Sequence, residues 1–227
     1  MRDRSHEVTR LEGFSDAVFG FALTLLVVSL ETPQNDADLR ALVRGLFPFA
    51  LTFAMVCWIW FQHNVFFRRY GLQDAWTVFL NCCLLFVVLF YVYPLKYLTS
   101  HLFGALAGDS AVNMQQVNGQ FVMLVYSSGV VVIFTAFLML HWHAWRKRQA
   151  LALDARGLLQ LRYSTRAHAI TMMLGAISVA LALIFPRQSA YAGLLYTLMG
   201  PLHGWNGFQG AKALSAAAAH PVLPPEA

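Results

Sequence analysis

The sequence predicts an all-α integral membrane protein with six transmembrane helices and with both termini in the cytoplasm. Two features of its composition support this prediction. Of the 227 residues, 58% are hydrophobic and only 12% are charged, whereas an ordinary soluble domain carries about 25% charged residues. A soluble chain this apolar could not cover its surface with polar side chains. The composition therefore excludes a soluble enzyme domain and a disordered chain.

The predicted spans are apolar runs that lie between charged residues and that approach the roughly 20 residues needed to cross a bilayer. The last run is the shortest and contains Gly200 and Pro201. The chain beyond it is rich in Ala, Gly and Pro, so we expect residues 206–227 to form a mobile cytoplasmic tail. We predict one domain, residues 1–205. Its six spans are predicted at residues 11–30, 45–67, 75–95, 121–140, 167–186 and 190–205.

The distribution of basic residues predicts the orientation. Loops on the cytoplasmic side of a membrane carry an excess of Lys and Arg. With the N-terminus inside and six spans, 16 Lys and Arg residues divide so that all but four lie on the cytoplasmic side. The four on the outer side are Arg40, Arg44, Lys96 and Arg187. The net charge of +5 is thereby explained without a nucleic-acid partner.

The first span has carboxylates at its start. Its uncharged part, Ala17–Leu30, would be about 21 Å long, which is shorter than a hydrocarbon core of about 30 Å. We therefore expect the helix to include Asp16, and a partner for that carboxylate from another helix. The alternative is that Ser15 or Asp16 is an N-cap at the membrane surface.

The same span has two distinct faces at helical spacing. Small residues along one stripe would let another helix approach closely, while bulky apolar residues along the other could close a pore by dewetting. Either stripe could face lipid, a neighbouring helix or a pore. The small stripe is Gly13, Ala17, Gly20 and Thr24, and the bulky stripe is Phe14, Val18, Phe21, Leu25 and Val28.

Polar residues of two further spans lie at the same depth as Asp16. Trp60 and His63 lie near the cytoplasmic end of the second span, and Asn81 lies early in the third. We expect these side chains to converge with Asp16 and Arg10 in one leaflet. Alternatively, His63 belongs to an interfacial aromatic belt, and Asn81 makes one interhelical hydrogen bond.

No catalytic or metal-binding pattern accompanies these features. The cysteines, Cys57, Cys82 and Cys83, have neither disulfide-framework nor zinc spacing. The sequence contains no phosphate-binding glycine motif, no nucleophile elbow and no carbonyl-filter sequence. It therefore predicts a protein that is not an enzyme and that needs no metal or other cofactor.

The pattern Arg10-x-x-x-Phe14-Ser15-Asp16, followed at once by an apolar run with Thr24, resembles the signature of the transmembrane protein 175 family of endosomal and lysosomal potassium channels. Trp60, His63, Asn81 and Pro94 are similar to the pattern of its second and third spans. The resemblance covers roughly residues 7–100. A single six-span repeat is typical of the prokaryotic members.

This resemblance implies a homotetramer in a prokaryotic cell membrane, with membrane lipid, potassium ions and copies of itself as its partners. The first span of each subunit would line a central pore. The constriction would consist of Phe21, Leu25 and Val28, with Thr24 as the polar pore position. Phe21 departs from the isoleucine common in the family. The remaining motif residues would anchor the helix: Arg10, Phe14, Ser15, Asp16, Trp60, His63 and Asn81.

Passive conduction of monovalent cations, with potassium preferred, is therefore the first functional hypothesis. A proton channel or proton-coupled transporter would instead use Asp16 and His63 as relay groups. A non-conducting membrane scaffold is the third hypothesis.

Overall fold

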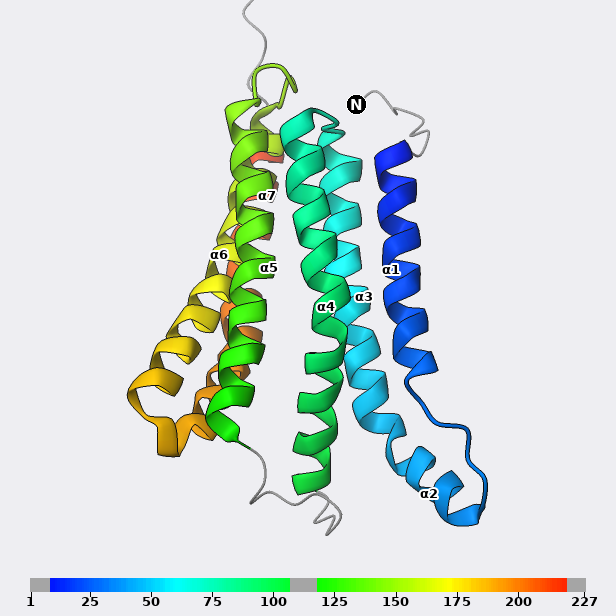
Figure 1. The fold of residues 1–227 in the computed structure, drawn as a ribbon. Coiled ribbons are helices and arrows are strands. Elements are labelled where there is room, and N and C mark those ends of the chain that lie inside the picture. Colours follow the sequence, from blue (N-terminus) through cyan, green and yellow to red (C-terminus); the bar gives the residue numbers. More distant parts are fainter. Residues whose placement is uncertain (1–8, 107–117, 220–227) are drawn as a thin grey trace, which may run out of the picture.

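The computed structural model describes residues 9–106 and 118–219, and the regular structure in these ranges is entirely helical (Figure 1). Long helices run along one bundle, with a short helix and a 3₁₀ helix in two of the connections. Their bounds are α1 Arg10–Val28, α2 Asp36–Arg44, α3 Leu46–Tyr70, α4 Ala75–Leu106, α5 Gly119–Arg146, α6 Ala155–Ile184, η1 Pro186–Leu198 and α7 Met199–Ala219.

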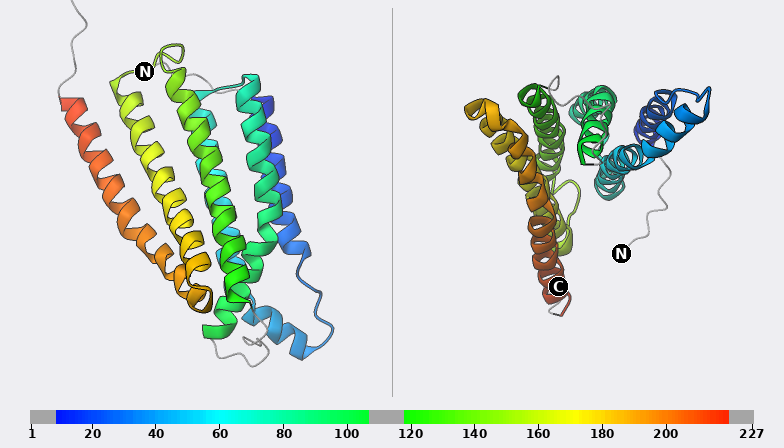
Figure 2. Two further views of the ribbon diagram at one scale, coloured as in Figure 1. Left: turned by 60° about the vertical axis from the view of Figure 1, so that its left-hand side comes forward. Right: turned by 90° about the horizontal axis from the view of Figure 1, so that it is seen from below.

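Five helices, α1, α3, α4, α5 and α6, are long and apolar enough to cross a membrane. The sixth long helix, α7, runs beside α6 along the bundle (Figure 2). The start of α1 and the end of α7 lie at the same end of the bundle. The chain is therefore a multi-pass helical membrane protein, as the composition predicts.

The helices pack in a row rather than around one centre. Helix α1 contacts α3 and α4, α4 contacts α5, and α6 lies between α5 and α7. Within the described ranges α1 has no contact with α5, α6 or α7, and α1 and α7 lie at opposite edges (Figure 2). One long side of α1 is consequently left without a neighbour from its own chain.

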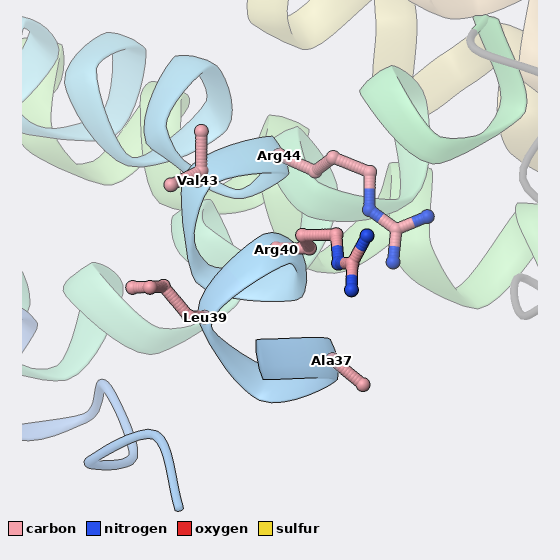
Figure 3. Close-up of a pocket in the computed structure, with 5 residues that line it drawn as sticks. All are labelled: Ala37, Leu39, Arg40, Val43 and Arg44. Atoms are coloured by element: carbon pink, nitrogen blue, oxygen red, sulfur yellow. The ribbon is translucent and has the colours of Figure 1, made fainter. Parts of the chain in front are cut away.

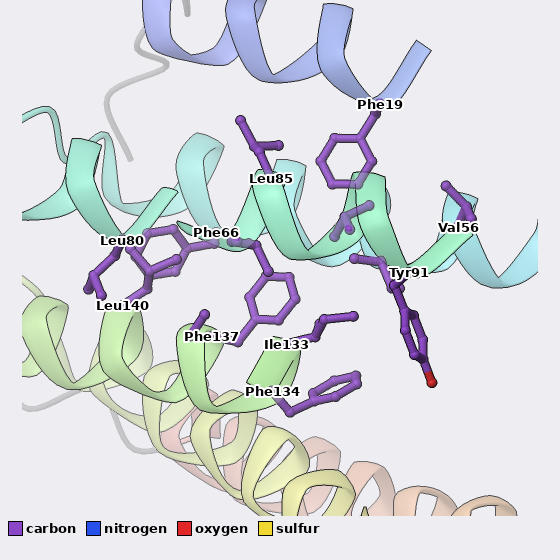
Figure 4. Close-up of a cluster of buried hydrophobic side chains, with 14 of the residues drawn as sticks. Phe19, Val56, Phe66, Leu80, Leu85, Tyr91, Ile133, Phe134, Phe137 and Leu140 are labelled. Atoms are coloured by element: carbon purple, nitrogen blue, oxygen red, sulfur yellow. The ribbon is translucent and has the colours of Figure 1, made fainter. Parts of the chain in front are cut away.

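Aromatic and aliphatic side chains fill the contact between the two halves of the row. Phe66 from α3, Leu85 from α4 and Phe137 from α5 belong to one buried cluster (Figure 4). The helices approach closely at Gly129, where an added Cβ would lie 2.1 Å from the Tyr91 ring. Tyr91 is itself fixed, because its hydroxyl donates to the Tyr126 carbonyl at 2.6 Å. Glycine is therefore required at position 129 for the close approach of α4 and α5.

Helix α1 begins earlier than either Ser15 or Asp16, so the N-cap alternative is wrong. Thr9 is the N-cap: its hydroxyl accepts from the Glu12 amide, and the Glu12 carboxylate accepts from the Thr9 amide. This capping box satisfies two backbone donors that have no partner within the helix. Asp16 therefore lies inside the helix.

Three helices extend beyond the predicted spans. Helix α4 does not end at Leu95 but continues through Pro94 to Leu106. Proline removes one backbone donor and can be tolerated when packing holds the helix on both sides, and Leu95 and Thr99 beyond it are buried. Helix α5 extends to Arg146, and α6 begins at Ala155 rather than residue 167 because Asp154 caps it.

The predicted sixth span and tail are also displaced. Residues 190–198 belong to the 3₁₀ helix η1, and α7 continues through the predicted tail as far as Ala219. Alanine is the strongest helix former, and the Asn206 amide donates to the Tyr163 carbonyl of α6 at 3.0 Å. These two effects fix residues 206–219 as helix. The N-terminal eight residues and residues 220–227 lie outside the described part of the chain.

The short helix α2 was not predicted. Asn35 caps it by accepting from the Ala37 and Asp38 amides. Arg40 and Arg44 extend to one side and Leu39 and Val43 to another, beside a hollow of about 630 Å³ (Figure 3). The helix is thus amphipathic and lies at the end of the bundle opposite to the start of α1.

Asp74 joins the start of α4 to the end of α5. Its carboxylate accepts from Thr77, from His143 Nε2 at 3.0 Å and from Lys147 Nζ at 3.0 Å. Burial raises the pKa of the Asp74 carboxyl, but the hydrogen bonds from His143, Lys147 and Thr77 outweigh burial and lower the pKa below its ordinary value. The charged carboxylate therefore stabilises this end of the α4–α5 pair.

Asp74→Asn should lower the free energy of unfolding at pH 7 by about 1 kcal/mol, the upper end for a partly exposed ion pair. Asparagine can still cap α4, so the change isolates the charge. Because the folded pKa lies below the ordinary 3.8, the stabilisation is complete above pH 3.8 and declines as the pH falls from there through the folded pKa. Thermal unfolding in detergent at about pH 7 and about pH 3 measures this: the difference should be smaller at the lower pH without vanishing, and a difference that does not shrink contradicts the prediction.

Gly129→Ala should lower the free energy of unfolding by about 1–3 kcal/mol, because the new methyl group overlaps a fixed ring. Gly204→Ala on α7 is the matched control, since a Cβ there meets no atom of the described residues within 4 Å. Apparent melting temperatures of the two variants in the same detergent provide the comparison. Equal melting temperatures would show that the α4–α5 contact is looser than the structure describes.

Candidate functional site

A buried chain of hydrogen bonds holds α1 against α3 and α4. His63 Nε2 donates to Asn81 Oδ1 at 2.7 Å, and Asn81 Nδ2 donates to Ser15 Oγ at 2.9 Å. The Ser15 hydroxyl then donates to the Leu11 carbonyl at 2.8 Å. Each of the three side chains is at most 1% exposed. The predicted convergence of polar side chains from three spans is thus present as one continuous chain.

Asp16 makes a separate contact with α3. The Trp60 indole N–H donates to Asp16 Oδ1 at 2.8 Å. Asp16 and His63 therefore have different partners rather than a hydrogen bond to each other. Arg10 and Phe14, which were predicted to belong to the anchor, lie on the exposed side of α1, and Arg10 has no hydrogen-bond or ion-pair partner among the described residues.

The other end of α1 is held by a lysine that the sequence reasoning treated only as a span boundary. Lys96 Nζ of α4 donates to the Ser29 carbonyl at 2.8 Å and to Ser29 Oγ at 2.7 Å. Ser29 is the C-cap of α1. A cation at a helix C-terminus is favourable because it faces unsatisfied carbonyl groups. The feature of the sequence that could have indicated this role is the position of Lys96, a charged residue directly after an apolar run.

The four predicted pore-lining residues share the side of α1 that faces away from α3 and α4. Phe21 is 67% exposed, Leu25 37% and Val28 72%, and Thr24 is also exposed. The opposite side, with Phe19, Ala22 and Leu26, is buried. The chain therefore leaves Phe21, Leu25 and Val28 uncovered on α1.

The small-residue stripe is equally free within the chain. A Cβ added at Gly13 or Gly20 would meet no described atom within 4 Å. Close helix approach, the usual use of such residues in membranes, is therefore not made here inside one subunit. The Thr24 hydroxyl donates to the Gly20 carbonyl oxygen at 2.9 Å. Its own oxygen lone pairs therefore stay free to interact with another group.

The exposed side of α1 is suited to lining an ion pathway or to packing against another helix, rather than to covalent chemistry. Among the described residues, no group of three His, Cys, Asp or Glu side chains could hold a metal ion. The exposed stripe offers apolar side chains and the hydroxyl oxygen of Thr24. Fold and site together define a multi-pass helical membrane protein whose first helix presents an apolar and hydroxyl-bearing face.

Comparison with known proteins gives the family. A family model described as endosomal/lysosomal potassium channel TMEM175 matches residues 10–91, which include both ends of the buried anchor. A protein named potassium channel from Marivirga tractuosa is 36% identical over 212 residues, covering 88% of this chain and 86% of the relative. The chain belongs to the TMEM175 family, as a prokaryotic member.

Solved structures agree with this assignment. A crystal structure of the potassium channel MtTMEM175, a variant in complex with a nanobody–MBP fusion protein, matches with a TM-score of 0.80 and 36% identity, covering 92% of this chain and 96% of that one. A homologue, from Chamaesiphon minutus, of the lysosomal potassium-selective channel TMEM175 matches with a TM-score of 0.60 and 23% identity over 87% and 96% of the two chains. The second likeness concerns the fold alone. Membership of a channel family confirms the prediction that the protein is not an enzyme.

Asn81→Leu should destabilise the protein, because it leaves the buried His63 Nε2–H without its acceptor and removes the donor to Ser15 Oγ. Each unsatisfied buried group costs about 1–3 kcal/mol. The neighbouring Cys82→Ala is the control, since Cys82 is exposed and free. Thermal unfolding in detergent should show a large loss for the first variant and a small one for the second. Similar losses would mean that the hydrogen-bond chain contributes little.

Proposed function

We propose that the protein is a channel for monovalent cations that prefers potassium and that works as a homotetramer in the cell membrane. Four copies of α1 would surround a central pore. The single observation that carries this proposal is the exposed stripe on α1, which remains uncovered while the opposite face is fixed by buried hydrogen bonds. The free Gly13 and Gly20 positions support close packing of α1 against another subunit.

The chemistry of the stripe supports cations as the permeant species. The Thr24 hydroxyl donates a hydrogen bond within its own helix, so its oxygen lone pairs can coordinate a cation. Asp16 is exposed near the start of the same helix and adds negative charge at that end. Selectivity would then come from side-chain oxygens and apolar rings rather than from a filter of backbone carbonyls.

The apolar residues would form successive constrictions along the pore. Phe21, Leu25 and Val28 follow one another at helical spacings of four and three residues, which correspond to about 6 Å and 4.5 Å along the axis. Rings of such side chains can close a pore by dewetting. Phe21, the residue that departs from the family pattern, would form the ring of largest side chains.

Leu25→Ala should raise potassium flux into liposomes by about tenfold, equivalent to about 1.4 kcal/mol off the permeation barrier. A smaller side chain widens an apolar constriction and makes it easier to wet. Val27→Ala is the matched control: Val27 is also exposed, at 51%, but lies on the flank of the stripe. Potassium and sodium gradients run in parallel, with a proton-sensitive dye, measure the flux of each ion.

The same assay separates the rival functions. Flux of protons alone, abolished by Asp16→Asn, would replace this proposal with a proton pathway. No flux of any ion from folded protein, with Leu25→Ala also silent, would leave a membrane scaffold. An equal effect of Leu25→Ala and Val27→Ala would contradict the assignment of the pore face.

A further inference from the structure

A second surface feature lies far from α1, between the end of α5 and the start of α6. It is a groove of about 760 Å³ with mostly apolar walls. It lies at the end of the bundle where α1 begins and α3 ends, which is the end that carries most of the basic residues. Its principal lining residues are Trp142 and Trp145 of α5 and Leu158, Leu159, Arg162 and Arg166 of α6.

The two arginines give the groove its charge. Arg162 and Arg166 are one helical turn apart, so they lie on one side of α6. Both ion pairs found among the described residues involve Asp74, so neither arginine is neutralised by a described carboxylate. Arg166 lies over the Tyr163 ring at 5.5 Å. The groove therefore combines an apolar wall with two guanidinium groups suited to phosphate.

The tryptophans place the groove at a membrane surface. Trp142 is 51% exposed and Trp145 44%, and both lie in the last turns of a helix that is apolar enough to cross the membrane. Tryptophan is enriched where hydrocarbon meets headgroups. An occupant of this groove would thus have its apolar part toward the hydrocarbon and its charged part at the headgroup level.

A histidine side chain that is almost fully buried also lines the groove. His141 is 3% exposed, and its Nδ1 donates to the Phe137 carbonyl at 2.8 Å. Its Nε2 has no hydrogen-bond partner in the described part of the chain. With Nδ1 carrying the proton, Nε2 is an acceptor and can accept a hydrogen bond from a hydroxyl group of a polar headgroup.

The hollow beside α2 is a weaker candidate, although it also has two arginines (Figure 3). Its lining residues come from one nine-residue helix. Asp36 and Asp38 in the first turn of that helix offset the charge of Arg40 and Arg44. The α5–α6 groove has walls from two helices, and Asp154 is the one acidic residue within 145–166.

We propose that the α5–α6 groove binds an anionic phospholipid. The phosphate would lie between Arg162 and Arg166, and an acyl chain would lie along Trp142, Leu158 and Leu159. Basic pockets between membrane helices are known to take such headgroups. This proposal goes beyond ion conduction and does not depend on α1 forming a pore.

Native mass spectrometry of the full-length protein tests the proposal, with phosphatidylglycerol or phosphatidylcholine added to protein in neutral detergent. Wild-type protein should bind phosphatidylglycerol more tightly than phosphatidylcholine. Combining Arg162→Gln with Arg166→Gln should weaken phosphatidylglycerol binding by about 30-fold, the effect of two basic residues near the membrane surface. Combining Arg68→Gln with Arg156→Gln is the matched control, because it removes the same charge at the same end outside the groove.

Several outcomes would overturn the proposal. Equal losses in the two double variants would mean diffuse attraction rather than a site. Competition by inorganic phosphate at equal concentration would mean that the acyl chain does not bind. A change of oligomeric mass in the groove variant, without a change in lipid binding, would assign this face to a second copy of the chain.

A fluorescence measurement locates the lipid independently of affinity. Phosphatidylglycerol with brominated acyl chains should quench tryptophan emission more than brominated phosphatidylcholine does. The difference should disappear when Trp142→Phe and Trp145→Phe are combined, and it should persist in Trp76→Phe. If the Trp142 and Trp145 changes leave the difference intact, the lipid binds elsewhere.

Discussion

The hydrogen-bond chain from His63 through Asn81 to Ser15 determines which face α1 presents to the rest of the molecule. In an apolar surrounding, a buried amide or hydroxyl without a partner costs far more than a formed hydrogen bond contributes. Each of these groups finds its partner at one rotation of α1 about its axis. One residue of helix turns by about 100°, so a register slip would replace exposed Phe21 with Ala22 and break the chain. The anchor thus sets the exposed stripe without touching it.

A second contact at the other end prevents α1 from pivoting about this anchor. Lys96 reaches the last carbonyl groups of α1 through Ser29, and between the two ends Phe19 and Leu26 are packed in the core. A helix fixed at both ends and along one side presents its free side as a rigid surface. The long extension of α4 beyond Pro94 makes this possible, because the same helix supplies both Asn81 and Lys96.

The existence of the spans and the convergence of polar residues could be predicted from sequence, because apolar length and residue spacing are local properties. Asn81 and His63 were expected near the first span for that reason. The end of α4 could not be predicted, since whether a helix passes a proline depends on the packing of residues such as Leu95 beyond it. The alanine-rich stretch after residue 206 was misassigned as mobile, because its helix also depends on contacts with α6. The role of Lys96 could not be predicted, because it depends on the contact with Ser29 at the end of α1.

Helices α1, α3 and α4 form one half of the bundle and α5, α6 and α7 the other, and the two halves meet mainly where α4 contacts α5. The family model matches residues 10–91, the part of the chain that contains α1, α3 and about half of α4. Helices α5, α6 and α7 have no described contact with α1, so the path from them to α1 within one chain runs through α3 and α4. In that connection Tyr91 packs closely against Gly129, and Asp74 bridges the same two helices at the end near the α5–α6 groove. A ligand in the groove could therefore influence α1 through the position of α4, the helix that holds it at both ends.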